Sequence, residues 1–183
     1  MDKMKPTDII YRWRVRGHFI SIVLAVILAK PNIYSLLSGI GFVVLGLLLR
    51  GWACGHLKKE KRLAVSGPYK YTRNPLYLGN LIIGMGIVAG ARSWWVLAIF
   101  IAYFLKFYPV VIIKEKNKMK QLFPQEYKEY SRKVPLFIPT LKPYAEAPDV
   151  RFNWDIYKKN KELRALIWGI IFWIILFLKM ILF

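Results

Sequence analysis

The chain is organised around a stretch at residues 67–79 that reads GPYKYTRNPLYLG. This stretch holds two prolines, two glycines and three tyrosines together with Lys70, Arg73 and Asn74, and it lies between a basic run at 58–62 and an apolar run that begins at Leu76. Position alone favours a helix-entry loop with interfacial tyrosines and a proline in the first helical turn. A polar, aromatic, proline-stiffened entry to a membrane helix is also suited to form one wall of a ligand site.

Outward from this stretch, the apolar residues come in blocks. The chain has 183 residues, of which 56% are apolar. Five blocks lack the polar face that a soluble helix needs, at about 19–29, 34–56, 76–91, 94–113 and 166–183, and a span of the bilayer takes roughly 20 residues. The pattern predicts an all-α polytopic integral membrane protein with about five transmembrane helices.

The net charge of +19 raises the possibility of nucleic-acid binding, so the location of the 29 Lys and Arg residues matters. Residues 1–17 hold five, 58–73 hold six and 114–164 hold thirteen, whereas the two short turns between them hold only Lys30 and Arg92. The positive-inside rule then predicts a cytoplasmic N-terminus, a cytoplasmic 58–73 loop and 114–164 segment, and a C-terminus on the opposite side. Contact with anionic headgroups explains this charge better than nucleic acid does.

Residues that bind metals are few. Cys54 is the single cysteine, and His18 and His56 are the two histidines. One cysteine forms no internal disulfide, and this set does not favour a zinc or iron centre. The prediction is that the protein has no metal site.

The second apolar block carries an arginine and several glycines. Arg50 lies about two turns before the basic loop, so its side chain either reaches the lipid phosphates or points into a polar cavity. Lys106 in the fourth block has the same two alternatives, and Lys179 near the end of the last block is expected to reach the interface. Close approach of neighbouring helices is the expected role of the glycines, which are Gly39, Gly41, Gly46, Gly51 and Gly55.

Beyond Ile113 the pattern becomes amphipathic. In KEKNKMKQLFPQEYKEYSRKVPLFIP, apolar residues recur at spacings of three and four, which predicts a helix that continues from the membrane, breaks near Pro124 and ends before Pro135. Pro109 should kink the preceding helix. We expect residues 1–139 to form the membrane core, 140–164 a cytosolic linker with a basic amphipathic segment, and 165–183 a C-terminal transmembrane helix. The apolar positions of the amphipathic helix are Met119, Leu122, Phe123, Tyr127 and Tyr130.

The hairpin of the third and fourth helices should bring two polar segments together on the cytoplasmic side. Residues from 58–79 would face residues from 114–135 and form a pocket. Such a pocket has rings that could stack on an adenine, a carboxylate for ribose hydroxyls or an ammonium, and cations for a carboxylate. The facing residues are Tyr69, Tyr71, Arg73, Asn74 and Tyr77 on one side, and Glu115, Lys116, Tyr127, Tyr130 and Arg132 on the other.

These two segments resemble the superfamily of isoprenylcysteine carboxyl methyltransferases and phospholipid methyltransferases, which are integral membrane enzymes. The resemblance covers about residues 45–139 and rests on GPYKYTRNPLYLG followed by the Glu115 to Pro139 pattern, with Arg50 and Trp52 near the end of the preceding helix. It implies that S-adenosylmethionine is held at the cytosolic side. It also implies a lipophilic acceptor from the bilayer, such as a prenylated carboxylate or a phospholipid amine.

Carried onto this chain, the resemblance assigns roles by residue. Catalytic roles fall on Arg73, Asn74 and Glu115. Cofactor binding involves these three with Tyr69, Tyr71, Pro75, Tyr77, Gly79, Lys116 and Tyr127. Substrate binding involves Arg50, Trp52, Tyr130 and Arg132.

Three departures from the superfamily pattern keep other functions open. Asn74 stands where histidine is usual, Lys116 where a second glutamate is usual, and Pro124 where glycine is usual. Asparagine cannot carry a proton near neutral pH, which excludes an obligatory imidazole base here. A catalytically inactive membrane scaffold is one alternative. An NADPH-dependent membrane reductase of the sterol-reductase type is another, although Asn80 replaces the acidic residue of its motif.

Overall fold

The computed structural model describes residues 6–58, 61–148, 150–160 and 162–183, and within 6–15 it describes the side chain of Trp13 alone. No strand occurs in these ranges. Parts of the basic run at 58–62 lie outside the described residues. The helices are α1 (Pro6–Leu28), α2 (Ile33–His56), the 3-10 helix η1 (Gly67–Lys70), α3 (Pro75–Ala91), α4 (Trp94–Leu122), α5 (Pro124–Lys133), α6 (Trp154–Lys159) and α7 (Leu163–Leu182).

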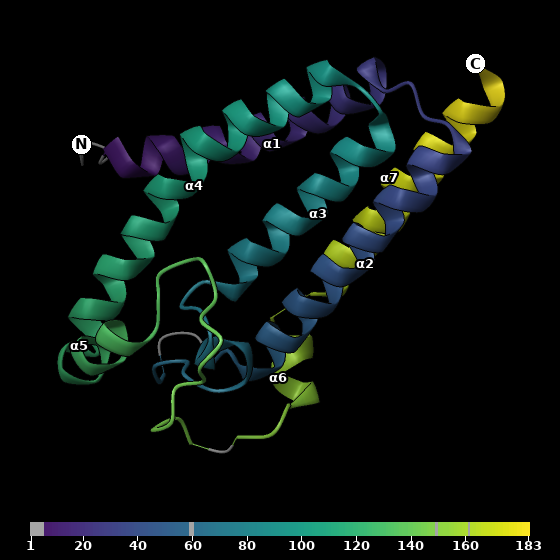
Figure 1. The fold of residues 1–183 in the computed structure, drawn as a ribbon. Coiled ribbons are helices and arrows are strands. Elements are labelled where there is room, and N and C mark those ends of the chain that lie inside the picture. Colours follow the sequence, from purple (N-terminus) through teal and green to yellow (C-terminus); the bar gives the residue numbers. More distant parts are fainter. Residues whose placement is uncertain (1–5, 59–60, 149, 161) are drawn as a thin grey trace.

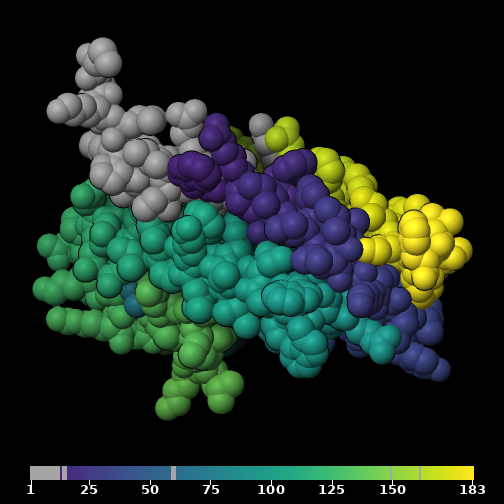
Figure 2. Space-filling model, turned by 90° about the horizontal axis from the view of Figure 1, so that it is seen from above, coloured from purple at the N-terminus to yellow at the C-terminus, as the bar shows by residue number. Residues whose placement is uncertain are grey.

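The long helices form a bundle with two different ends (Figure 1). In the ribbon, α7 lies beside α2, α3 follows, and α4 crosses α1. Residues 61–74, 134–148 and 150–153 gather with α5 and α6 at one end, which we call the motif end. Figure 2, seen from above, shows the second half of α4 and α5 in green at one end and the C-terminus of α7 in yellow at the other.

Glycines let α2 and α3 pack backbone against backbone. A Cβ atom added to Gly39 would lie 2.5 Å from the carbonyl oxygen of Gly86, and one added to Gly46 would lie 2.7 Å from the carbonyl oxygen of Gly79. Both distances are below any ordinary van der Waals contact, so only glycine fits. The predicted packing role is confirmed at these positions. Gly41 is different, because a Cβ there meets nothing within 4 Å.

In the part of the chain that the structure describes, three helices are long and apolar enough to cross a membrane, namely α2, α4 and α7. The apolar parts of α1 (Arg16–Leu28) and of α3 are shorter. At 17 residues, α3 rises about 25 Å, somewhat less than the hydrocarbon thickness of ~30 Å. The all-helical class is confirmed, and the count of five spans stays a prediction.

The end opposite the motif end is closed by polar contacts between helices. The amide of Lys30 donates to the carbonyl of Ala91 at 2.8 Å, which joins the α1–α2 turn to the α3–α4 turn. The Nζ of Lys179 donates to the carbonyls of Val26 and Ile27 at 2.8 and 2.7 Å. Lys179 therefore caps the C-terminal carbonyls of α1, where a cation is favourable.

Some helix boundaries differ from the sequence prediction. Helix α1 begins at Pro6, well before the apolar block, because the residues that precede this block, three of them arginines, are compatible with a helix. Helix α4 runs through Pro109 as one helix, and it changes direction along its length (Figure 1), as an internal proline requires. The predicted break at Pro124 and the end before Pro135 are confirmed, since α5 spans Pro124–Lys133.

The amphipathic face of α4 and α5 builds a small second core at the motif end. Leu63, Tyr127, Tyr130 and Val134 are buried together there, with Met119 and other apolar residues against them. Leu122 instead is 44% exposed, because it precedes the break at Pro124 and turns away from this face. The second core fixes α5 against the loop that leads into η1.

Candidate functional site

The two sequence motifs meet at the motif end through backbone contacts. The amide of Arg73 donates to the carbonyl of Pro135 at 3.0 Å, and the amide of Thr140 donates to the carbonyl of Tyr71 at 2.9 Å. The hydroxyl of Thr72, a buried side chain, donates to the carbonyl of Phe137 at 2.8 Å. The segment after α5 is therefore docked along residues 71–73, which directly follow η1.

Asn74 belongs to this junction. It occupies the N-cap position of α3 without a capping side-chain bond, and Pro75 follows at the start of the helix. Its Nδ2 donates instead to the carbonyl of Leu136 at 2.8 Å, and the residue is 8% exposed. The amide therefore holds the second motif against the first, a bond that an asparagine makes without any proton transfer.

Arg73 faces Tyr127 across the two motifs. Its Nη1 donates to the Tyr127 hydroxyl at 2.8 Å, and the guanidinium carbon lies 5.6 Å from the centre of that ring. Its Nε is buried and has no hydrogen-bond partner among the described residues. A buried charged donor without an acceptor is costly, so Nε is an unsatisfied polar atom at the junction of the two motifs.

Tyr77 and Glu115 form the second cross-motif contact. The Tyr77 hydroxyl donates to Oε1 of Glu115 at 2.6 Å, a short hydrogen bond between two oxygens. The Tyr77 ring meets Tyr108 edge-on at 5.6 Å, and Tyr108 stacks on Phe104 at 4.2 Å. Glu115 is exposed, and the neighbouring Lys116 is partly buried.

Tyr69 and Tyr130 make the third contact, which is structural in character. The Tyr130 hydroxyl donates to the carbonyl of Tyr69 at 2.6 Å, and Tyr130 is 2% exposed. Burial is the main cause that raises the pKa of both phenols above the ordinary value. Both rings stay neutral across the physiological range, and Tyr130 serves as a fixed donor between the motifs.

The two glycines that bound the first motif each give room to a side chain. Gly67 has φ +59 and a Cβ there would lie 2.5 Å from the His56 ring, so both backbone and space require glycine. A Cβ on Gly79 would lie 2.5 Å from Cγ of Arg50. Gly79 thus lets the Arg50 side chain cross from α2 to α3.

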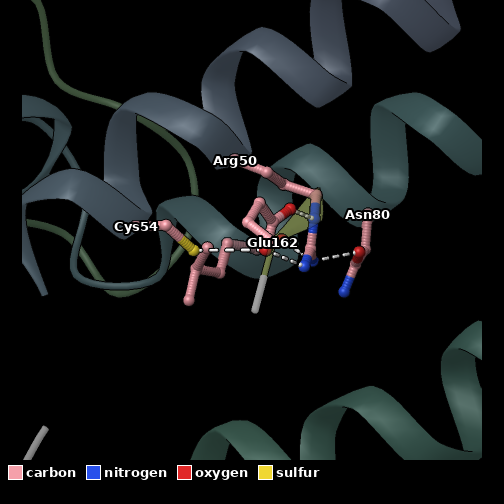
Figure 3. Close-up of polar contacts among 5 residues, drawn as sticks. Arg50, Cys54, Asn80 and Glu162 are labelled. Atoms are coloured by element: carbon pink, nitrogen blue, oxygen red, sulfur yellow. Dashed lines mark hydrogen bonds and ion pairs between the residues drawn. The ribbon is translucent and has the colours of Figure 1, made fainter. Parts of the chain in front are cut away.

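Arg50 lies in a polar cluster inside the bundle (Figure 3). Its Nε and Nη2 donate to the two carboxylate oxygens of Glu162 at 2.6 and 2.9 Å, and its Nη1 donates to Oδ1 of Asn80 at 2.5 Å. The Cys54 thiol donates to Glu162 at 3.2 Å. Of the two alternatives for Arg50, the structure shows the inward one, because its side chain is 17% exposed.

A groove of about 500 Å³ opens beside this cluster, between α2 and the segment that contains α6 and the start of α7. Its walls are almost entirely apolar, with Trp52, Phe152 and Tyr157 among them and Glu162 as the charged residue. Trp52 is 45% exposed, so its ring is available along this groove. The groove has the character of a site for a hydrocarbon chain.

The remaining residues that were predicted to bind cofactor or substrate lie at the edge of the junction between the two motifs. Arg132 is exposed near the end of α5, and Tyr71 is partly buried and contributes its carbonyl to the junction. Among the residues that the structure describes, no group of His, Cys, Asp and Glu could hold a metal ion.

Comparison with known proteins places this arrangement in a family. Residues 20–126, more than half of the chain, match the phospholipid methyltransferase family. The chain belongs to that family, and with its apolar helices it is a membrane protein. The matched part includes Arg50, Arg73, Tyr77 and Glu115 and ends before Tyr130 and Glu162.

Individual relatives are partial matches. The chain is 39% identical over 87 residues to the cobalt-zinc-cadmium resistance protein CzcN of Cupriavidus metallidurans, covering 48% of this chain and 40% of that protein. It is 36% identical over 84 residues to the nickel-cobalt-cadmium resistance protein NccN of Alcaligenes xylosoxydans xylosoxydans, covering 46% and 39% respectively. It is 29% identical over 116 residues to the protein-S-isoprenylcysteine O-methyltransferase of Schizosaccharomyces pombe, covering 57% and 49%. The matches span half or less of each relative's length, and no solved structure matches.

Sequence reasoning did not identify Glu162 as part of the site. It stands just before the last apolar block, more than a hundred residues from its partner Arg50. A signal was present, because an arginine inside an apolar helix needs a counter-charge. Glu162 is the acidic residue nearest to the start of the last apolar block.

Proposed function

We propose that this chain transfers the methyl group of S-adenosylmethionine to a lipophilic acceptor at the membrane surface. The observation that carries the proposal is the junction of the two motifs, where Arg73 meets Tyr127 and Tyr77 meets Glu115. Membership of the phospholipid methyltransferase family supports the same reaction.

The residues at this junction fit the cofactor. The buried Nε of Arg73 lacks an acceptor among the described residues, and a carboxylate of the amino-acid portion would supply one. Glu115 is an exposed carboxylate that could accept from an ammonium or from ribose hydroxyls. Tyr77 and Tyr108 provide rings beside it. The cofactor, when bound, supplies an electrophilic methyl group on a sulfonium sulfur.

The protein's own contribution is alignment and exclusion of water. Asn74, Thr72 and Tyr130 tie the two motifs together, so Arg73 and Glu115 are held on one rigid frame. Holding reactants in line supplies a large share of the acceleration of a displacement. The apolar groove beside Trp52 would take the hydrocarbon chain of the acceptor.

The two possible classes of methyl acceptor differ in whether they must lose a proton before the transfer. A carboxylate acceptor is already ionised and needs no base. An amine acceptor must lose a proton, and Glu115 is the carboxylate of the junction that could accept it. Asn74 cannot do so, and its amide is bonded to Leu136.

The test is a transfer assay with S-adenosylmethionine labelled in the methyl group, purified protein, total lipid extract and prenylcysteine analogues. We expect label in the organic phase, lost in Arg73→Ala and Glu115→Ala and kept in Glu126→Ala, an exposed acid on α5. Treatment of the product with alkali distinguishes the acceptors, because a methyl ester releases volatile methanol and an N-methyl group does not. Absence of transfer with intact cofactor binding would support an inactive scaffold, and binding of NADPH alone would support a reductase.

A further inference from the structure

The ion pair between Arg50 and Glu162 joins the family core to a part of the chain outside the family match. Arg50 lies within residues 20–126, and Glu162 lies beyond them, at the N-cap of α7. The pair is bidentate and nearly dry, with side-chain exposures of 17% and 7%. A buried arginine needs such a partner, since an unpaired charge at this depth is strongly unfavourable.

Hydrogen bonds from Asn153 and Asn160 to the end of α2 fix the position of Glu162. The Nδ2 of Asn160 donates to the carbonyls of Cys54 and Leu57 at 2.9 and 3.0 Å, and the amide of Asn153 donates to the carbonyl of Gly55 at 3.2 Å. These are the carbonyls that a helix end leaves without partners. Asn153 and Asn160 therefore cap α2, and Glu162 at the start of α7 meets Arg50 from one defined direction.

From this pair, Arg50 reaches the beginning of α3. Its Nη1 donates to Oδ1 of Asn80 at 2.5 Å and lies 3.4 Å from the carbonyl of Leu76. These two partners flank Tyr77, whose hydroxyl donates to Glu115. Figure 3 shows the guanidinium between Glu162 on one side and Asn80 on the other.

We infer that Glu162 is a positioning residue of the proposed site: its carboxylate orients Arg50, and Arg50 in turn holds the start of α3 so that Tyr77 meets Glu115. The C-terminal segment then helps to set the geometry of the site, although it lies outside the family match. Without the carboxylate, the guanidinium would turn toward lipid phosphates, and α3 would lose its anchor beside Tyr77. This inference rests on the proposed function.

The test compares Glu162→Gln with Asp155→Asn, a matched loss of one carboxylate on an exposed position of the same segment. The first readout is hydrogen exchange of the α3 amides near Tyr77 in the cofactor-free protein. The second is the dissociation constant for S-adenosylhomocysteine. We expect faster exchange and about tenfold weaker binding in Glu162→Gln, the change that one charge-assisted hydrogen bond would give, partial recovery in Glu162→Asp, and no change in Asp155→Asn.

Asn80→Ala keeps the ion pair and removes the shorter of the two contacts from Arg50 to α3, so it decides the question if Glu162→Gln does not fold. It should reproduce the weaker binding. Unchanged exchange in α3, or faster exchange with unchanged affinity, would overturn the positioning role. If the wild-type protein binds no S-adenosylhomocysteine, the proposed function fails, whereas exchange in α3 still reports whether Glu162 holds that helix through Arg50.

Discussion

Replacement of Gly39 by alanine tests the packing that holds the site's two main helices together. The new Cβ would lie 2.5 Å from the carbonyl oxygen of Gly86 and 2.8 Å from the amide nitrogen of Gly90. Both neighbours are backbone atoms, so α2 and α3 must separate by about 1 Å to restore an ordinary contact. Overpacking of this kind costs about 1–3 kcal/mol. We expect the free energy of unfolding to fall by this amount.

Gly41→Ala is the matched control, because it lies two residues away on the same helix and its Cβ would meet nothing within 4 Å. At this position, the only expected effect of alanine on the free energy of unfolding is its higher helix propensity, which amounts to at most about 1 kcal/mol. Titration of the detergent-solubilised protein with sodium dodecyl sulfate, followed by circular dichroism, gives both unfolding free energies. Equal stability of the two variants would refute the close approach of α2 and α3 at Gly39.

Three further predictions concern the motif end and the opposite end. Tyr130→Phe should lower the free energy of unfolding by about 1–3 kcal/mol, because the carbonyl of Tyr69 loses its buried donor; an unchanged thermal midpoint would contradict this. The pKa of Tyr69 and Tyr130 is raised, so the folded state keeps protons that the unfolded state loses above the ordinary pKa of 10.0. The free energy of unfolding should therefore decline as the pH rises beyond that value. Thermal midpoints measured from pH 8 to 11 should show this decline, and the decline should be smaller in Tyr130→Phe. Lys179→Met removes two donors from the C-terminal carbonyls of α1, so hydrogen exchange near Val26 should accelerate while exchange in α5 stays unchanged.

The meeting of the two motifs could be predicted from the sequence because it depends on local signals. Prolines fix where α3 and α5 begin, and the charge pattern places both segments on one side. The spacing of Tyr127 and Tyr130 identifies the buried face of α5, and both are buried. The roles of these residues toward a cofactor remain predictions.

Other features of the site could not be predicted because they depend on contacts distant in sequence. The partner of Arg50 follows from how Asn153 and Asn160 cap α2, which no local pattern encodes. The bond from Asn74 to Leu136 likewise needs the docked conformation of the segment after α5. That bond shows what the asparagine at this position does in the structure, which is to join the motifs as a neutral donor.

The central claim is that the junction of the two motifs holds S-adenosylmethionine, and equilibrium binding of labelled S-adenosylhomocysteine tests it most directly. Purified wild-type protein should bind the ligand saturably. Arg73→Ala should abolish this binding because it removes the buried Nε donor, and Glu126→Ala should leave it unchanged. No saturable binding by the wild-type protein, or equal binding by Arg73→Ala, would contradict the account.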